Sequence, residues 1–261
     1  SPTQIQIDAL KSNDWKAFFI SVCTNANIIE AVTDLNFDVP TQLDWITTEG
    51  GDFVIILTWL LNHTTDYDII RNYITSASAS ERQAALADAS IRTLINSKLT
   101  APFSVGIFSH LLLNSMFWKN PEYNDFFAHF VTSGGSAPLP ATATMNCWES
   151  IMYAAFLANK VDAAWIQHFY NIAFAASDPN AVIWNQLGWN SALPTYPPAV
   201  PTAGQLIFYT EIGRPYPGHV AMAIDATHAI SLWSQPNNTN FIQRINITDL
   251  TGVIQVANPP W

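Results

Sequence analysis

The spacing of apolar residues in the first half of the chain predicts helices. In IQIDALKSNDWKAFFISV (5–22) apolar residues recur close to helical spacing. SERQAALADASIRTLINSKL (80–99) starts with Ser80 as N-cap and has Gln83 three residues later, the pattern of a capping box. We therefore expect residues 1–135 to form a helical region, whose role the sequence does not indicate.

Two long apolar runs fall inside this region, FVIILTWLL (53–61) and FSVGIFSHLLLNSMFW (103–118). The first is about half as long as a bilayer-spanning helix, and the second carries a His, three Ser and an Asn. Both are expected to be buried core helices rather than membrane spans.

The pattern changes after residue 135. TSGGSAPLPATAT (132–144) has the composition of a loop, a helix is expected from Cys147, and another near 178–188 with Asp178 as N-cap and Pro179 in the first turn. Short segments rich in β-branched and aromatic residues follow the proline-rich stretch 193–204, and they predict strands: QLIFYT, HVAMAI, AISLWSQ, FIQRINI and GVIQV. Helices followed by a small antiparallel sheet predict an α+β fold, with a second domain over 136–261.

Composition excludes some functions. Charged residues make up 11% of the chain and hydrophobic residues 49%, which is typical of a globular protein with a large core. The net charge of −10 and the scattered basic residues argue against a nucleic-acid partner. The opening SPTQIQIDAL shows no signal-peptide pattern, so either none exists or the sequence starts after it.

Cys147 is the candidate nucleophile. Asn146 is a good N-cap and Glu149 stands where a capping-box acid belongs, so the helix should start at Cys147 itself. A thiol in the first turn lies beside unpaired N–H groups, which should lower its pKa and favour the thiolate. Cys23, inside an apolar helical stretch, is expected to be inert; a bridge between the two cysteines would remove this hypothesis.

His219 stands at the start of a predicted strand, directly after Pro217 and Gly218. The segments NCWES, GQLIFY and GHVAMAI together resemble the NlpC/P60 and CHAP branch of papain-like cysteine hydrolases over about residues 140–240. The resemblance implies Cys147 as nucleophile and His219 as base. The sequence departs from the family in two places. Asn-Cys-Trp-Glu replaces the usual Asp-Cys-Ser-Gly, and the segment immediately before Cys147 holds no Tyr, Gln or His that could bind an oxyanion.

The side chain that orients His219 should come from the next strand. Residues opposed in an antiparallel hairpin point to the same face, so Gln235 is opposite His219 with a three-residue loop and Ser231 is opposite it with a tighter turn. We prefer Gln235, with Ser231 second and Asn237 third. Ala221 and Ala223, on the face of His219, are expected to leave room for substrate and for the Cys147 helix.

Trp148 and Trp233 are expected to flank the cleft and bind substrate. The other histidines, His63, His110, His129 and His168, have no metal-ligand spacing, and His228 is expected to be a solvated turn residue. The sequence also contains no phosphate-binding loop. From the histidine spacing we expect no metal, and from the missing loop we expect no nucleotide cofactor.

The first functional hypothesis is a cysteine hydrolase of the peptidase or amidase type. The resemblance implies a peptidoglycan peptide as substrate and a bacterial source. A secreted toxin or an effector delivered to another cell would suit this layout, with an inhibitor or immunity protein as a possible partner. Deamidation, transglutamination or proteolysis of a host protein is the second hypothesis. The third is a papain-like binding protein that has lost activity.

Overall fold

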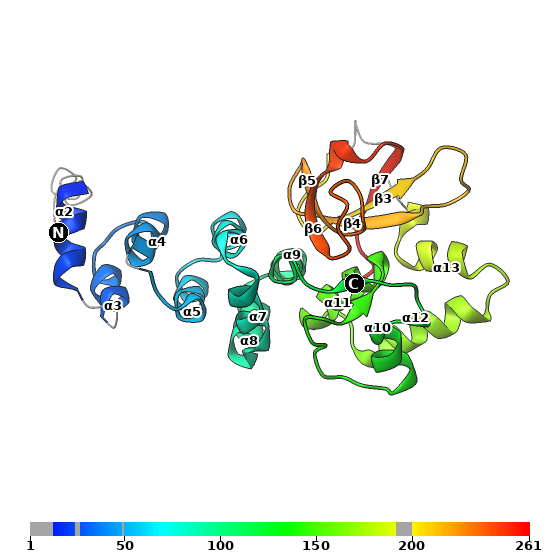
Figure 1. Ribbon diagram of the computed structural model, residues 1–261, viewed down its shortest axis with the longest axis horizontal. Coiled ribbons are helices and arrows are strands. Elements are labelled where there is room, and N and C mark those ends of the chain that lie inside the picture. Colours follow the sequence, from blue (N-terminus) through cyan, green and yellow to red (C-terminus); the bar gives the residue numbers. More distant parts are fainter. Residues whose placement is uncertain (1–12, 24–26, 49, 192–199) are drawn as a thin grey trace. The chain divides into compact units, whose positions relative to one another are not determined.

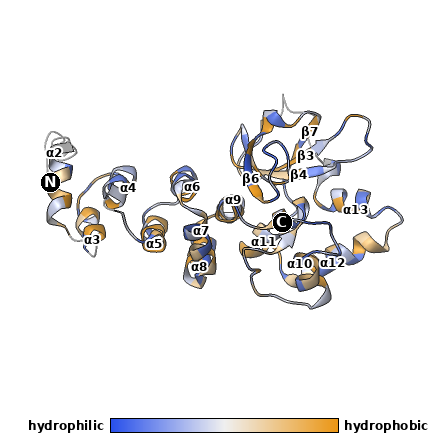
Figure 2. Cartoon of the chain, viewed as in Figure 1, coloured by the Kyte–Doolittle hydropathy of each residue, from blue (hydrophilic) through white to orange (hydrophobic). Residues whose placement is uncertain are grey.

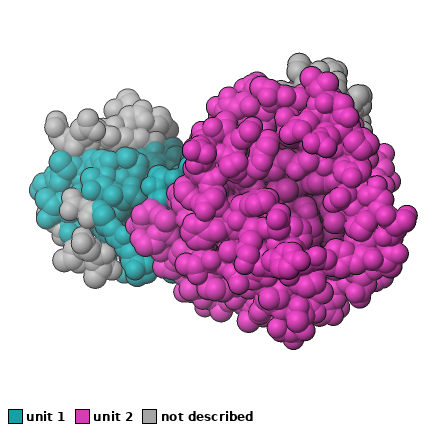
Figure 3. All heavy atoms as spheres, turned by 45° about the vertical axis from the view of Figure 1, so that its right-hand side comes forward, with its two compact units in different colours: residues 1–77 teal, residues 78–261 magenta. Residues whose placement is uncertain are grey.

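A computed structural model describes residues 13–23, 27–48, 50–191 and 200–261. The chain divides into two compact units, residues 1–77 and residues 78–261 (Figure 3).

The unit boundary lies well before the position 135/136 expected from composition. The helices of residues 79–111 belong to the second unit, because the last of them packs on the helix that starts at Cys147 and on the strand that starts at His219. Composition changes where helices give way to strands, whereas the boundary is set by which elements share a core.

The first unit consists of short helices, each packed on the next from the second one onwards. Their bounds are α2 Asn13–Val22, α3 Ile28–Thr33, α4 Val39–Thr48, α5 Phe53–His63 and α6 Tyr67–Ser76. They carry hydrophobic and hydrophilic residues side by side (Figure 2). The run 53–61 is a core helix as expected, with Leu57 and Leu60 fully buried. Residues 5–12 of the first predicted helix lie outside the described residues.

The second unit contains the remaining helices. Their bounds are α7 Ala79–Ala87, α8 Ala89–Lys98, α9 Ala101–Leu111, α10 Asp125–Phe127, the π-helical turn η1 Ala128–Thr132, α11 Cys147–Leu157, α12 Ala163–Ala175, α13 Pro179–Gln186 and the 3-10 turns η2 Trp189–Ser191 and η3 Ile247–Asp249. Asp178 caps α13 as expected, accepting the Ala181 N–H at 3.2 Å.

The start of the helix predicted at Ser80 is wrong by two residues. Ser78 is the N-cap, and its capping-box partner is Glu81 rather than Gln83. Two overlapping Ser-x-x-Glu/Gln patterns occur here, and a carboxylate interacts more favourably with the helix dipole than an amide does. The segment also forms two helices rather than one, because Asp88 ends α7 and caps α8.

The five predicted strands form one antiparallel sheet, so the α+β class and the small sheet are confirmed. Its strands are β3 Leu206–Thr210, β4 His219–Ala223, β5 His228–Leu232, β6 Ile242–Asn246 and β7 Val253–Ala257, in the spatial order β6-β5-β4-β3-β7. A two-residue parallel pair lies outside it, β1 Phe117–Trp118 with β2 Thr144–Met145. In Figure 1 the sheet forms one layer of this unit, and α11 and α12 lie on one side of it.

The two faces of the sheet have different partners. Met222 of β4 accepts a hydrogen bond from the Ser109 hydroxyl of α9, and Phe208 of β3 packs edge-on against Trp184 of α13. These even-numbered residues face the helices. The odd-numbered face buries a second apolar cluster, closed over by Ile247 and Leu250.

Within the described residues, no helix is both long enough and apolar enough to cross a membrane, which agrees with the expectation of no membrane span.

Candidate active site

Helix α11 starts at Cys147, and the cap predicted from the sequence is present. The Asn146 side chain accepts the Glu149 N–H at 2.9 Å, and the Glu149 carboxylate accepts the Asn146 N–H at 2.7 Å. Each group satisfies a backbone donor that the first turn would otherwise leave unpaired. The reciprocal pair therefore fixes the backbone that carries the thiol.

Glu149 does more than cap the helix. Its carboxylate is fully buried and also accepts hydrogen bonds from the Tyr170 hydroxyl of α12 and the Asn124 amide. Burial raises the Glu149 pKa to about 7, although these hydrogen bonds oppose the rise. Sequence reasoning found the cap but missed this network, because Tyr170 and Asn124 lie 21 and 25 residues away in the chain.

Cys147 is a free thiol, and so is Cys23, so no bridge joins them. The Cys147 side chain is only 7% exposed. Burial raises its pKa to about 11, and the nearby Glu149 carboxylate adds to the rise. The expected lowering is therefore wrong. The backbone N–H groups of the first turn do favour the thiolate, but desolvation outweighs them.

A backbone N–H of β4 also reaches the thiol. The Val220 N–H is directed at the Cys147 sulfur and favours its charged form. The pairing of β4 with β5 explains why this donor is free, because the ladder extends only over Met222–Ile230 and Ala223–Ala229. Beyond Met222 the two strands separate, and the start of α11 meets β4 there. The nucleophile candidate thus lies one residue along β4 from His219.

His219 is oriented by Ser231. The imidazole Nε2 and the Ser231 hydroxyl lie 2.8 Å apart, and both side chains are at most 2% exposed. Burial lowers the His219 pKa to about 3, so the ring is neutral in this conformation. A bond through Nε2 leaves Nδ1 as the ring atom for a second partner.

The structure does not place Gln235 at His219. Continuing the register of Ala223 with Ala229 puts Trp233 opposite His219, between the two alternatives expected from turn geometry. Gln235 lies beyond the end of β5 and is exposed, and Asn237 bonds Gln243. Ser231, the second choice, reaches the imidazole diagonally across the strands.

Trp233 covers the imidazole. Its ring stacks on His219, with ring centroids 4.6 Å apart and planes 25° from parallel. The centroids of the Trp233 and Tyr209 rings are 5.4 Å apart. Trp148 packs instead between Phe169 and Tyr170 of α12, so its expected place beside the cleft is wrong. The Trp148 side chain therefore packs α11 against α12.

The space expected beside His219 is filled. Ala221 and Ala223 share its face, but they pack with Ile207 and Ala229 in the second apolar cluster. Helix α9 and Met222 meet on the opposite face. These small residues therefore allow close packing of the sheet rather than room for the Cys147 helix.

The thiol approaches β4 at the Val220 backbone, whereas the His219 imidazole lies on the sheet face opposite to Met222, with Ser231 and Trp233. Among the hydrogen bonds of the described residues, none joins Cys147 to His219. Catalytic hydrogen bonds are often long or poorly aligned before substrate binds. For turnover the thiol and the imidazole must come within hydrogen-bond reach of each other.

The other histidines show no metal cluster. In the described part of the chain, no three His, Cys, Asp or Glu side chains gather in a way that could hold an ion. His228 is not a free turn residue, because its Nδ1 lies 3.0 Å from an Asp225 oxygen.

The chain was compared with protein-family models, with curated proteins and with solved structures, and none of them matches it.

Proposed function

We propose that the second unit is a cysteine-dependent amide hydrolase. The observation that supports the proposal is that the Cys147 thiol, on a capped helix start, is reached by the Val220 backbone of β4, one residue from His219, whose imidazole is bonded to the Ser231 hydroxyl. Acyl transfer through a thioester needs a nucleophile, a base and an orienting group, and these three side chains supply one of each.

The reaction has two halves. His219 accepts the thiol proton, and the Cys147 sulfur attacks the amide carbonyl carbon to form a tetrahedral intermediate. The amine leaves with the proton from His219, and a thioester remains. His219 then activates a water molecule, which hydrolyses the thioester and regenerates the thiol.

Backbone donors are suited to stabilise the oxyanion. The N–H groups of Cys147 and Val220 both approach the sulfur, so they are the nearest candidates to bind the oxygen on the carbon that the sulfur attacks. Using Val220 would supply the second donor that the sequence before Cys147 lacks.

Digestion of purified sacculi tests the substrate that the family resemblance implies. The wild-type chain should release cross-linked or stem-peptide fragments, identified by mass spectrometry. Cys147→Ala and His219→Ala should each reduce release by at least about 1,000-fold while circular dichroism stays unchanged. The matched control is Cys23→Ala, which should retain activity. Release that persists in Cys147→Ala would contradict the mechanism. Inactive wild-type protein on sacculi, combined with deamidation or cleavage of a protein substrate, would favour the host-protein alternative.

A binding protein without catalysis is the second candidate. The raised pKa of Cys147 and the lowered pKa of His219 favour a neutral, unreactive pair. Under this alternative an activity-based thiol probe does not label Cys147 at neutral pH, even after the chain has met its ligand. Ligand-dependent labelling of Cys147 supports the hydrolase.

A further inference from the structure

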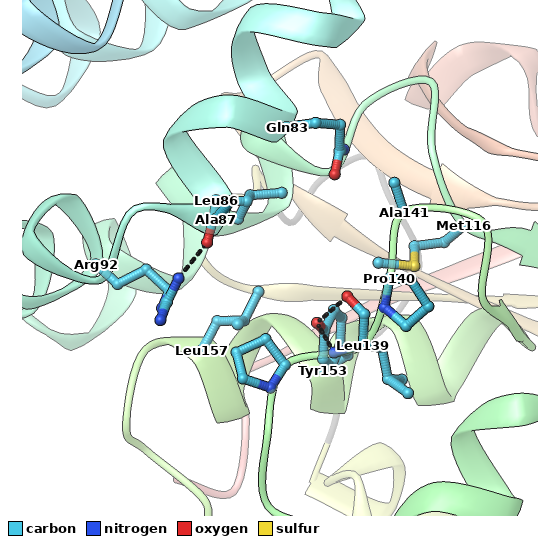
Figure 4. A pocket seen from close by; sticks show the side chains of 11 residues that line it. Gln83, Leu86, Ala87, Arg92, Met116, Leu139, Pro140, Ala141, Tyr153 and Leu157 are labelled. Atoms are coloured by element: carbon cyan, nitrogen blue, oxygen red, sulfur yellow. Dashed lines mark hydrogen bonds between the residues drawn. The ribbon is translucent and has the colours of Figure 1, made fainter.

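A hollow of about 440 Å³ opens beside the C-terminal half of α11, at the other end of the helix from Cys147. Figure 4 shows Gln83 of α7, Arg92 of α8 and Tyr153 of α11 arranged around it. Apolar side chains form most of the wall: Leu86, Met116, Pro138, Leu139, Pro140 and Leu157. Its volume is in the usual range of ligand pockets.

A second hollow of about 250 Å³ adjoins the first. Arg92, Pro138 and Leu157 line both, so the two form one groove with Arg92 at their junction. The second hollow is polar, with Thr93, Asn96, Ser136 and Asn159 among its lining residues. The groove therefore changes from apolar to polar along its length.

One residue that lines each hollow has a buried polar atom without a partner. The Gln83 amide nitrogen in the first and the Asn96 amide oxygen in the second have no hydrogen-bond partner among the described residues. Buried polar atoms are nearly always paired. Both atoms are closed to solvent, so a ligand reaches them when the Gln83 and Asn96 side chains turn into the groove.

Arg92 is the one charged side chain that lines either hollow, among the described residues. Its guanidinium donates to the Leu86 carbonyl and lies near the Tyr153 hydroxyl, whose charged form it favours. It forms no ion pair with any described residue. In a chain with a net charge of −10, a cation without a carboxylate partner in a groove complements an anionic group.

The groove wall also holds a strained residue. Met116 has a φ of +55°, a conformation that is uncommon for a residue other than glycine, and its N–H donates to the Ala141 carbonyl at 2.9 Å. Such conformations occur disproportionately where a wall is shaped for a ligand.

We propose that this groove binds an extended peptide segment with an apolar residue followed by an acidic one. The apolar side chain enters the first hollow and a peptide carbonyl accepts from Gln83. The carboxylate binds Arg92, and a peptide N–H further along donates to Asn96. An extended chain offers these groups in succession, at about 3.3 Å per residue. Binding at this groove is independent of the reaction proposed for Cys147.

Fluorescence anisotropy tests the proposal with a fluorescein-labelled peptide of sequence Gly-Leu-Val-Asp-Ser-Gly, amidated at its C-terminus. The full chain with Cys147→Ala is used, so that cleavage cannot deplete the peptide. We expect saturable binding below about 1 mM, weakened at least about tenfold when Asn replaces Asp in the peptide.

Arg92→Gln should weaken binding of the Asp peptide at least about tenfold and should remove the preference for Asp over Asn. Lys98→Gln, an exposed cation on the same helix outside the groove, is the matched control and should change neither. Ala87→Trp fills the first hollow from an exposed position and should abolish binding, whereas Ala84→Trp on the same helix should not.

The proposal is wrong if the peptide shows no saturable binding, or if Arg92→Gln keeps the preference for Asp. Equal binding by Ala87→Trp and Ala84→Trp overturns it as well. Binding of chitotetraose at the groove without binding of the peptide would make it a glycan site instead.

Discussion

The two ends of α11 differ in what they bury and what they leave open. At its start, the groups capable of chemistry are enclosed and mostly paired: Glu149 is saturated with hydrogen bonds, and His219 is bonded to Ser231 and covered by Trp233. At its other end a groove contains unpaired polar atoms but no nucleophile. Reactivity at the first end therefore requires the thiol and the imidazole to come together, whereas the second end already has an apolar hollow with Arg92 at its edge.

The largest expected effect is the pH dependence of Cys147 labelling. Because its pKa is raised to about 11, its alkylation by iodoacetamide should accelerate about tenfold per pH unit, or about 1,000-fold between pH 7 and 10. Labelling is followed by peptide mass spectrometry. A rate that levels off below pH 9 would mean that the thiol is not enclosed, and the contrast between the two helix ends would disappear.

The next effect is on stability. The Glu149 pKa is raised to about 7 from 4.5, so the folded chain holds this proton more tightly than the unfolded chain, and stability falls as pH rises from 4.5 through 7. The His219 pKa is lowered to about 3 from 6.5, so its contribution is lost as pH falls from 6.5 through 3. The two terms oppose each other between pH 4.5 and 6.5.

Glu149→Gln separates these terms. Urea denaturation gives the free energy of unfolding of Glu149→Gln and of wild type at each pH. The difference, variant minus wild type, should become about 3 kcal/mol more positive between pH 4 and pH 7. The matched control is Glu81→Gln, at the same capping position of α7 but exposed, which should show no comparable pH-dependent gain. A constant difference across this range would show that Glu149 is already ionised in the folded chain at acidic pH.

Removing the cover of the imidazole should have a smaller effect. Trp233→Ala should expose His219 to water, raising its pKa by about one unit or more and accelerating Cys147 labelling about tenfold. Trp233→Phe retains an aromatic cover and should change both much less. The His219 pKa is measured by NMR titration of the ring protons, and an unchanged pKa in Trp233→Ala would show that the sheet alone keeps the ring neutral.

The smallest expected effect concerns the orienting hydroxyl. Ser231→Ala removes the partner of His219 Nε2 and should lower kcat/KM by about threefold to tenfold, because one neutral hydrogen bond is lost. Ser234→Ala, an exposed serine three residues later, is the control. A Ser231→Ala variant as active as wild type would leave His219 without an orienting partner in the mechanism.

Local signals predicted most of the fold. The cap at Asn146, the Asp178–Pro179 start of α13 and the five strands depend on residues close together in the chain, so sequence reasoning located them. The error at Ser80 has the same origin, because two overlapping local patterns compete and only packing selects Ser78.

Features set by tertiary structure could not be predicted. Which residue meets His219 depends on the turn between β4 and β5, where a shift of two residues in register exchanges Ser231 for Trp233, or Trp233 for Gln235. The Cys147 pKa depends on how deeply α11 is buried, which the cap does not reveal.

The cap of α11 has a practical consequence. Both of its reciprocal hydrogen bonds involve Asn146 and Glu149, and neither uses the side chain at position 147. The sulfur can therefore be exchanged for a hydroxyl, a hydrogen or a selenol without loss of either bond. Substitutions at position 147 can thus compare side-chain groups of different nucleophilicity while the backbone of the helix start stays the same.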